Sequence, residues 1–306
     1  MSAHRHQTSP HGTSFIFALV ITVGYAAVEL AGGLWTGSLA LLSDAGHMFS
    51  DALALGLAAI AAWLARRPAG QRHSYGWARA EVIGATINSV LMLVIIVALV
   101  VEAVTRLLDP QPVAALGMTI IALIGMAINA LVIWIMSHSE QTLNTRAALL
   151  HMIGDLVSSF AALVAGAVIY FTGWLPIDPI LSLAIAALIL ISTMRLLRDT
   201  THVLMEGVPP ALELRDIGKA MAGIPGVLSV HDLHVWSITP GQVALSAHLE
   251  ISDLGKWPGI LATATELLRE RYDISHVTLQ PELHHSVSAR SPAVIRLWPR
   301  GRRPRK

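Results

Sequence analysis

Two histidine–aspartate pairs stand inside long apolar stretches of this chain. One pair is His47 and Asp51, and the other is His151 and Asp155, both with the spacing i, i+4. Residues at that spacing share one face of an α-helix, one turn apart. Two imidazole nitrogens and two carboxylate oxygens suit a tetrahedral zinc ion, with metal–ligand distances of about 2.0–2.2 Å. If the two helices face each other, the four side chains form a metal site.

The stretches that carry these pairs are long enough to cross a bilayer, which takes about 20 mostly apolar residues. Six segments qualify: Phe15–Trp35, Leu39–Ala65, Val82–Thr105, Val113–Met136, Ala147–Phe171 and Ile177–Met194. Ionisable groups inside a bilayer are expensive and tend to mark a pathway or a site. A closed metal site at that depth suggests that the metal itself is the cargo. The alternative, that each pair is only a hydrogen-bonded helix contact, is weaker because the pattern occurs twice.

Other polar residues in these segments have simpler interpretations. Asp44 lies one turn before His47, where it either caps the helix or accepts a hydrogen bond from a metal ligand. Glu29, Asn88 and Asn129 are expected to form hydrogen bonds between helices.

The composition agrees with a membrane protein. The chain has 306 residues, of which 54% are hydrophobic and 13% charged, and its mean hydropathy is +0.61. Soluble domains carry about 25% charged residues. A net charge of +1 gives no basic field for nucleic acid. There is no cysteine, so a metal must bind to His, Asp or Glu.

The charges of the loops predict the orientation of the chain in the membrane. Basic residues concentrate after the second, fourth and sixth apolar segments: Arg66, Arg67, Arg72 and Arg79, then Arg146, then Arg195 and Arg198. Because cytoplasmic loops carry the excess of Lys and Arg, both termini are predicted to be cytoplasmic.

The hydrophobic pattern of the sequence changes after Pro209–Pro210. The pattern predicts a helix, two strands, a helix and a third strand at Ala211–Gly223, Val227–Thr239, Gln242–Ile251, Trp257–Tyr272 and Ile274–Glu282. That order favours a small open sheet with helices on one face. The predicted division is a histidine-containing lead at 1–14 (with His4, His6 and His11), a six-helix domain at 15–208, the small α/β domain at 209–283 and a basic tail at 284–306.

Three motifs carry a resemblance to a known family. They are Gly37-Ser-Leu-Ala-Leu-Leu-Ser-Asp-Ala-Gly-His47, Arg72-His-Ser-Tyr-Gly-Trp-Ala-Arg-Ala-Glu81 and His231-Asp-Leu-His-Val-Trp236. Over roughly residues 15–283 the chain resembles the cation diffusion facilitators. The resemblance implies an α-helical membrane protein with six transmembrane helices and a C-terminal cytoplasmic ferredoxin-like (metallochaperone-like) domain. It also implies a homodimer that exchanges metal for protons by alternating access.

The resemblance assigns the metal transport site to His47, Asp51, His151 and Asp155. A histidine at the first of these positions resembles zinc-preferring members. It also implies that Arg79 pairs with Glu206. Of the family's site in the loop between the second and third spans, only His73 remains.

The resemblance further points to a second metal site in the cytoplasmic domain, at His231, His248 and the end of the third strand. His276 and Glu282 are the candidates there, and Gln280 stands where some relatives have a ligand histidine. Strand alternation places His248 opposite the apolar face. The same alternation counts against His231 as a ligand, because it places His231 on the same face as apolar Leu233 and Val235. His234 is then the competing candidate on this strand. The alternative is a set of surface histidines.

The predicted function is therefore export of Zn²⁺ from the cytoplasm in exchange for protons, across a bacterial cytoplasmic membrane. The predicted partners are a second copy of the chain and membrane lipids, with neither nucleic acid nor an organic substrate. The alternatives are export of Cd²⁺, Co²⁺, Fe²⁺ or Mn²⁺, or a membrane metal-binding enzyme or sensor. An enzyme is less favoured because neither His-Glu-x-x-His nor Gly-x-Ser-x-Gly occurs.

Overall fold

The computed structural model describes residues 11–65, 67, 70–137, 143–239 and 241–283. At 11–19, 58, 62, 65, 135–136 and 143–151 only the backbone is described. The N-terminal residues His4 and His6 and the basic tail therefore lie outside the described residues. The chain forms two compact units, residues 1–59 with 84–197 and residues 60–83 with 198–306.

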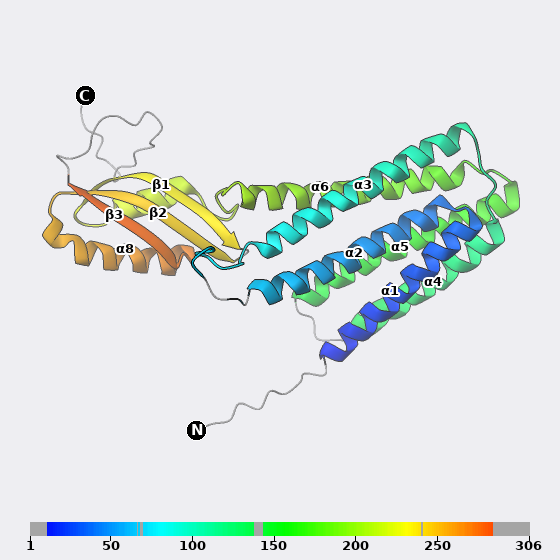
Figure 1. Cartoon of the computed structure of the whole chain (residues 1–306), viewed down its shortest axis with the longest axis horizontal. Coiled ribbons are helices and arrows are strands. Elements are labelled where there is room, and N and C mark those ends of the chain that lie inside the picture. Colours follow the sequence, from blue (N-terminus) through cyan, green and yellow to red (C-terminus); the bar gives the residue numbers. More distant parts are fainter. Residues whose placement is uncertain (1–10, 66, 68–69, 138–142, 240, 284–306) are drawn as a thin grey trace, which may run out of the picture. The chain divides into compact units, whose positions relative to one another are not determined.

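Six long helices occupy the apolar part of the chain (Figure 1). Their bounds are α1 His11–Thr36, α2 Leu39–Ala65, α3 Ala80–Leu108, α4 Ala115–Ser137, α5 Leu143–Thr172 and α6 Ile177–Leu204. Each predicted apolar segment is thus helical. Over the described residues, four stretches are long and apolar enough to cross a membrane: Ala80–Leu108, Ala115–Trp134, Met152–Thr172 and Ile177–Leu204. In α1 the corresponding apolar stretch, Val20–Thr36, is shorter.

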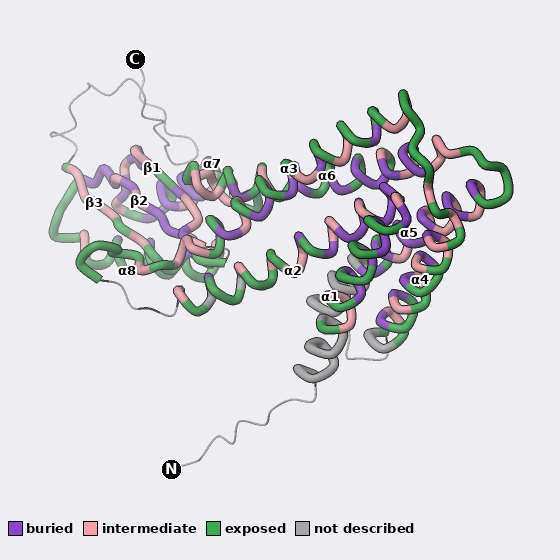
Figure 2. Tube along the Cα trace, turned by 45° about the vertical axis from the view of Figure 1, so that its right-hand side comes forward, coloured by how far each residue is buried: buried purple, intermediate pink, exposed green. Residues whose placement is uncertain are grey.

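The helices expose large apolar side chains on their outer faces, where the tube in Figure 2 is coloured as exposed. Val94, Val97 and Leu188 are 63%, 61% and 64% exposed. Soluble proteins rarely present such contiguous apolar surface to water. Lipid is the solvent that suits it.

Inside the first unit the helices pack through small apolar clusters. Leu41 of α2, Met118 of α4 and Ile169 of α5 belong to one buried cluster. In α5, Gly166 lies so close to α4 that a Cβ there would be 3.2 Å from the backbone nitrogen of Thr119. Small residues allow such close approach, which stabilises helix pairs in membranes. A separate buried cluster joins Met92 of α3 to helix α6.

The turn between α1 and α2 is fastened by α6. The carboxylate of Asp178 is fully buried and accepts hydrogen bonds from Ser38 Oγ at 2.8 Å and from the backbone N–H groups of Leu39 and Ala40 at 2.7 and 3.1 Å. These are groups at the start of α2 that have no intrahelical acceptor. Asp178 therefore caps α2 from a distant part of the chain.

The second unit contains the small α/β fold. Its elements are α7 Leu214–Ala222, β1 Val227–Thr239, β2 Gln242–Ile251, a 3₁₀ turn Leu254–Lys256, α8 Trp257–Tyr272 and β3 His276–Leu283. The sheet order is β1-β2-β3, antiparallel between β1 and β2 and parallel between β2 and β3. Strands β1 and β2 and helix α8 have the predicted bounds, whereas α7 starts three residues later and β3 two residues later than expected.

The two helices and one face of this sheet enclose a single apolar core. Ile217 and Met221 of α7, Leu245 and Leu249 of β2 and Leu268 of α8 all lie in it. The ends of the helices are tied at Asp216, which accepts from Tyr272 Oη at 2.7 Å and Arg271 Nη2 at 3.1 Å. Burial raises the pKa of Tyr272 to about 12, so its hydroxyl stays a donor.

Candidate metal sites

The first candidate site begins on α2. His47 Nε2 and Asp51 Oδ2 lie 3.7 Å apart, one helical turn from each other. Their side chains are 23% and 33% exposed. The imidazole and the carboxylate therefore form a pair on one face of the helix, as the spacing predicts.

The other predicted ligands lie on α5. Asp155 is 1% exposed, and His151 lies one turn before it in the helix, with a side chain outside the described residues. Helices α2 and α5 meet at this level, because Asp44 accepts hydrogen bonds from Ser158 Oγ and, at 3.3 Å, from Ser159 Oγ. Asp44 also interacts electrostatically with Asp155.

Two of the remaining polar residues in the apolar helices make the contacts expected of them. Ser50 Oγ donates to Asn88 Oδ1 at 3.4 Å, which joins α2 to α3. Asn129 Nδ2 donates to Ser159 Oγ at 3.2 Å, which joins α4 to α5. The prediction of interhelical hydrogen bonds at these two asparagines is confirmed. Asp44 is a buried acceptor within α2 and not a cap at its start.

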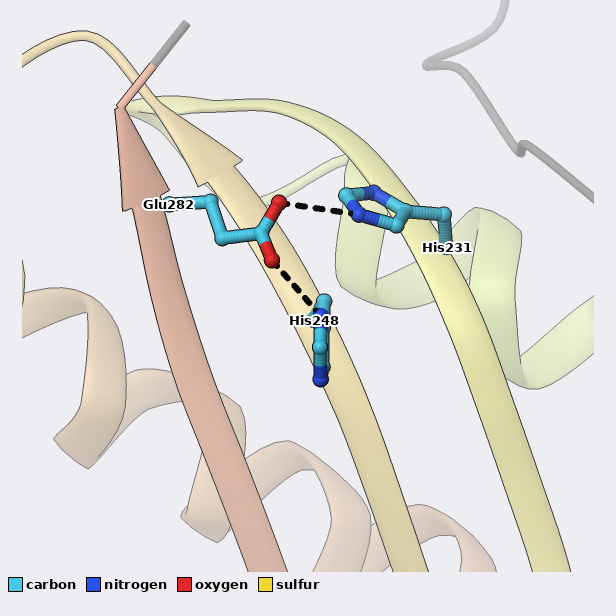
Figure 3. Close-up of side chains that lie close together, drawn as sticks. All are labelled: His231, His248 and Glu282. Carbon is cyan, nitrogen blue, oxygen red and sulfur yellow. Dashed lines mark hydrogen bonds and ion pairs between the residues drawn. The ribbon is translucent and has the colours of Figure 1, made fainter. Parts of the chain in front are cut away.

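The second candidate site lies on the sheet of the small α/β domain (Figure 3). His231 Nε2 is 3.0 Å from Glu282 Oε2, and His248 Nδ1 is 2.7 Å from Glu282 Oε1. One ligand atom from each of these three residues lies within 4.8 Å of the other two. Across the described part of the chain, this is the group of three side chains that has the spacing of a metal site, and His47, Asp51 and Asp155 do not form such a group.

A bulge in β1 brings His231 into this group. The pairing with β2 shifts between His231 and His234, and Asp232 between them has a left-handed φ of 51°. An extra residue in a strand reverses the alternation of side chains beyond it. His231 therefore lies opposite His248, on the face away from the core, although Leu233 and Val235 are core residues. The alternation argument against His231 fails for this reason.

The other histidines near the sheet do not join the group. His234 is 64% exposed and contacts Asp232 at 3.0 Å. His276 is paired in register with Ala244, and its ring meets the edge of Tyr75 at 5.7 Å between centroids. His276 and Glu282 are on the same side of β3, but six residues of strand separate them by about 20 Å.

The chemistry of His231, His248 and Glu282 fits a divalent metal. Two imidazoles and one carboxylate are a common zinc ligand set that leaves a fourth position open. His231 is only 6% exposed, and its Nδ1 has no hydrogen-bond partner among the described residues. A buried polar atom without a partner costs free energy, but this nitrogen is not the one that faces Glu282.

The link between α2 and α3 makes two further contacts inside the second unit. Arg79 Nη2 lies 3.0 Å from Glu206 Oε1, so the predicted pair is in contact. His73 packs against Trp77 with 4.7 Å between ring centroids. No metal group forms around His73 among the described residues.

Comparisons with known proteins agree with this architecture. The profile of the cation efflux transmembrane domain matches residues 15–205, and that of the cation efflux protein cytoplasmic domain matches residues 209–284. The chain is 39% identical over 285 residues to the cadmium, cobalt and zinc/H(+)-K(+) antiporter of Bacillus subtilis, which covers 91% of each chain. It is 38% identical over 290 residues to the zinc transporter ZitB of Escherichia coli, which covers 92% of each.

A more distant relative is the metal cation efflux system protein CzcD of Cupriavidus metallidurans, with 34% identity over 288 residues, 92% of this chain and 91% of that protein. The solved metal-bound C-terminal domain of a CzcD transporter matches 24% of this chain and all of that domain at 35% identity, with a TM-score of 0.22.

Proposed function

The chain belongs to the cation efflux family, the cation diffusion facilitators, and on that basis we propose that it exports Zn²⁺ from the cytoplasm in exchange for protons. One observation carries the proposal: α2 and α5 each contain a His–Asp pair at the spacing i, i+4, and hydrogen bonds from Ser158 and Ser159 to Asp44 join the two helices about one turn from those pairs. His47, Asp51, His151 and Asp155 are the proposed ligands of the transported ion.

The ligand types explain how metal and proton flows are coupled. Zinc binds neutral imidazole and ionised carboxylate, so loading the ion expels any protons that these groups hold. In the state open to the cytoplasm zinc displaces protons. In the state open to the other side, a more acidic solution returns protons and displaces zinc. Two relatives have names in line with this cycle: one is called a zinc transporter and the other an H(+)-K(+) antiporter.

Other divalent ions are the second candidate cargo. A relative is named for cadmium and cobalt as well as zinc. His47 favours zinc, since imidazole on α2 makes the site softer than carboxylate would. An intramembrane hydrolase or a sensor is less well supported, because the family and the relatives are named for efflux and transport.

We further propose a homodimer with both termini in the cytoplasm. The metal group lies on the sheet face opposite the core, so a second copy can reach it. The domain has a core of its own but is small for independent stability. Metal at His231, His248 and Glu282 would stabilise its paired form, and is not on the transport path.

Zinc flux into proteoliposomes, measured with and without a proton gradient, tests the proposal. A transporter coupled to protons gives flux that rises when the compartment receiving zinc is acidic. A hydrolase or a sensor gives no flux in either condition, and an uncoupled channel gives the same flux in both.

A further inference from the structure

A second pair of acidic side chains is buried beside the proposed transport site. Glu29 of α1 and Asp44 of α2 are both 0% exposed. Each carboxyl group acts electrostatically on the other. Neither belongs to the proposed ligand set. Two ionised carboxylates that are buried together repel each other, so a proton bound to one of them lowers the free energy of the pair.

The surrounding donors indicate which of the two is protonated. Asp44 accepts from two hydroxyl groups, those of Ser158 and Ser159. Glu29 has Tyr25 Oη at 3.0 Å from its Oε1, but the same hydroxyl lies 2.8 Å from the backbone oxygen of Ile121. A tyrosine hydroxyl has one hydrogen and can serve only one of them. The ionised form is therefore better supported at Asp44.

The other carboxyl oxygen of Glu29 also indicates that Glu29 is the protonated residue. Among the described residues, Oε2 has no N–H or O–H donor, although the side chain is fully buried. A buried carboxylate oxygen without a donor is costly, whereas a carboxylic acid group removes the charge and supplies a donor. The position of this oxygen is thus an observation that indicates a bound proton.

Among the described residues, the titratable groups that act on Glu29 carry no positive charge. The titratable groups that act on Glu29 are Tyr25, Asp44 and Asp155, and His47 acts on Asp44. Helix α4, which packs on α1, contains no titratable residue. Helix α4 lies close to α1 here, since a Cβ on Gly125 would clash with the hydroxyl of Tyr25.

We propose that Glu29 binds one proton in the metal-free transporter and releases it to water when Zn²⁺ binds beside Asp155. The bound cation supplies the positive charge that lets Glu29 ionise, so the Glu29 O–H bond breaks and a free proton leaves. Glu29 then contributes a counter-transported proton without contacting the metal. The inference rests on the proposed zinc site.

The test counts the protons released per zinc ion bound to the full-length protein in detergent. Every protein carries His248→Ala, which disables the cytoplasmic group. Calorimetric zinc titrations in two buffers of different ionisation enthalpy give the count. Glu29→Gln is isosteric and cannot ionise, Glu29→Asp restores a carboxyl group, and Ser182→Ala is a control at a buried polar residue that cannot titrate.

Glu29→Gln should bind zinc and release about one proton fewer per ion. Equivalently, the slope of log Kd against pH, which is negative when protons are released, decreases in magnitude by about one. Glu29→Asp should restore the release, and Ser182→Ala should not change it. An unchanged count in Glu29→Gln overturns the inference. So does a zinc affinity that depends on K⁺ at constant pH and loses this dependence in Glu29→Gln, because Glu29 would then bind a metal ion in place of a proton.

A second measurement covers the case in which Glu29→Gln does not fold. Infrared difference spectra of the protein with ¹³C-labelled glutamate separate Glu29 from Asp51 and Asp155. Loss of a labelled protonated-carboxyl band on zinc addition supports the inference, and its absence overturns it. Failure of the proposed function looks different: zinc binding to the His248→Ala protein would then survive Asp155→Asn undiminished.

Discussion

Replacing His248 with alanine separates the metal-dependent stability of the cytoplasmic domain from its intrinsic stability. The change removes contacts to Glu282 at 2.7 Å and to Asp232 at 3.7 Å. The side chain is 30% exposed, and partly exposed pairs of this kind contribute about 0–1 kcal/mol. Without metal, the melting temperature should therefore change little.

The zinc-dependent increment is larger. A ligand that binds only the folded state stabilises it by about 2.7 kcal/mol at a hundredfold excess over Kd. For a domain of this size, 1 kcal/mol corresponds to about 4–8 °C, so zinc should raise the melting temperature by about 10–20 °C. His248→Ala removes one of three ligands and should abolish most of that rise.

Scanning calorimetry of a fragment spanning residues 205–285, with and without zinc, measures both quantities. His276→Ala is the matched control, because His276 lies on the same sheet but outside the group of His231, His248 and Glu282. It should keep the zinc increment. The reasoning is refuted if the wild-type fragment ignores zinc, or if His276→Ala and His248→Ala lose the increment equally.

Three other changes probe the transporter as a whole. Exchanging Arg79 and Glu206 should recover transport lost in either single reversal, whereas independent charges would give the sum of the two single effects. His47→Asp makes the α2 half of the site all-oxygen, so manganese or cadmium flux should rise relative to zinc, and an unchanged ratio would place selectivity elsewhere. Asp178→Ala leaves the buried N–H groups of Leu39 and Ala40 without an acceptor. It should destabilise the detergent-solubilised protein by about 1–3 kcal/mol, measured in a thermal melt. An unchanged melting temperature would show that α2 needs no cap from α6.

The secondary structure could largely be predicted from the sequence because its signals are local. Runs of about 20 apolar residues indicate membrane helices whatever surrounds them. The strands Val227–Thr239 and Gln242–Ile251 are bounded by turn residues that define their ends. The predicted start of β3 is two residues too early, because Ile274 belongs to the apolar core yet precedes the paired part of the strand.

The cytoplasmic group needed information that the sequence pattern does not contain. A bulge at Asp232 changes the face on which His231 lies, and no glycine or proline marks it. A non-glycine residue with positive φ is uncommon, although Asp is among those that tolerate it. The short motif His231-Asp-Leu-His234, with an aspartate between two histidines, was the one available signal.

The proximity of Glu29 and Asp44 could also not be predicted from the sequence. Both residues could be seen as polar groups in apolar helices, but their contact joins α1 to α2 and depends on tertiary packing. The orphaned oxygen of Glu29 becomes visible only when every donor around it is accounted for.

Zinc flux in proteoliposomes under a proton gradient tests whether the His–Asp pairs of α2 and α5 bind the transported ion. The comparison is Asp51→Ala and Asp155→Ala against Asp199→Ala, an exposed aspartate on α6. We expect background flux in the first two variants, with insertion and folding retained, and full flux in the third. Flux near the wild-type level in well-folded Asp51→Ala or Asp155→Ala protein would show that these carboxylates do not bind the transported ion.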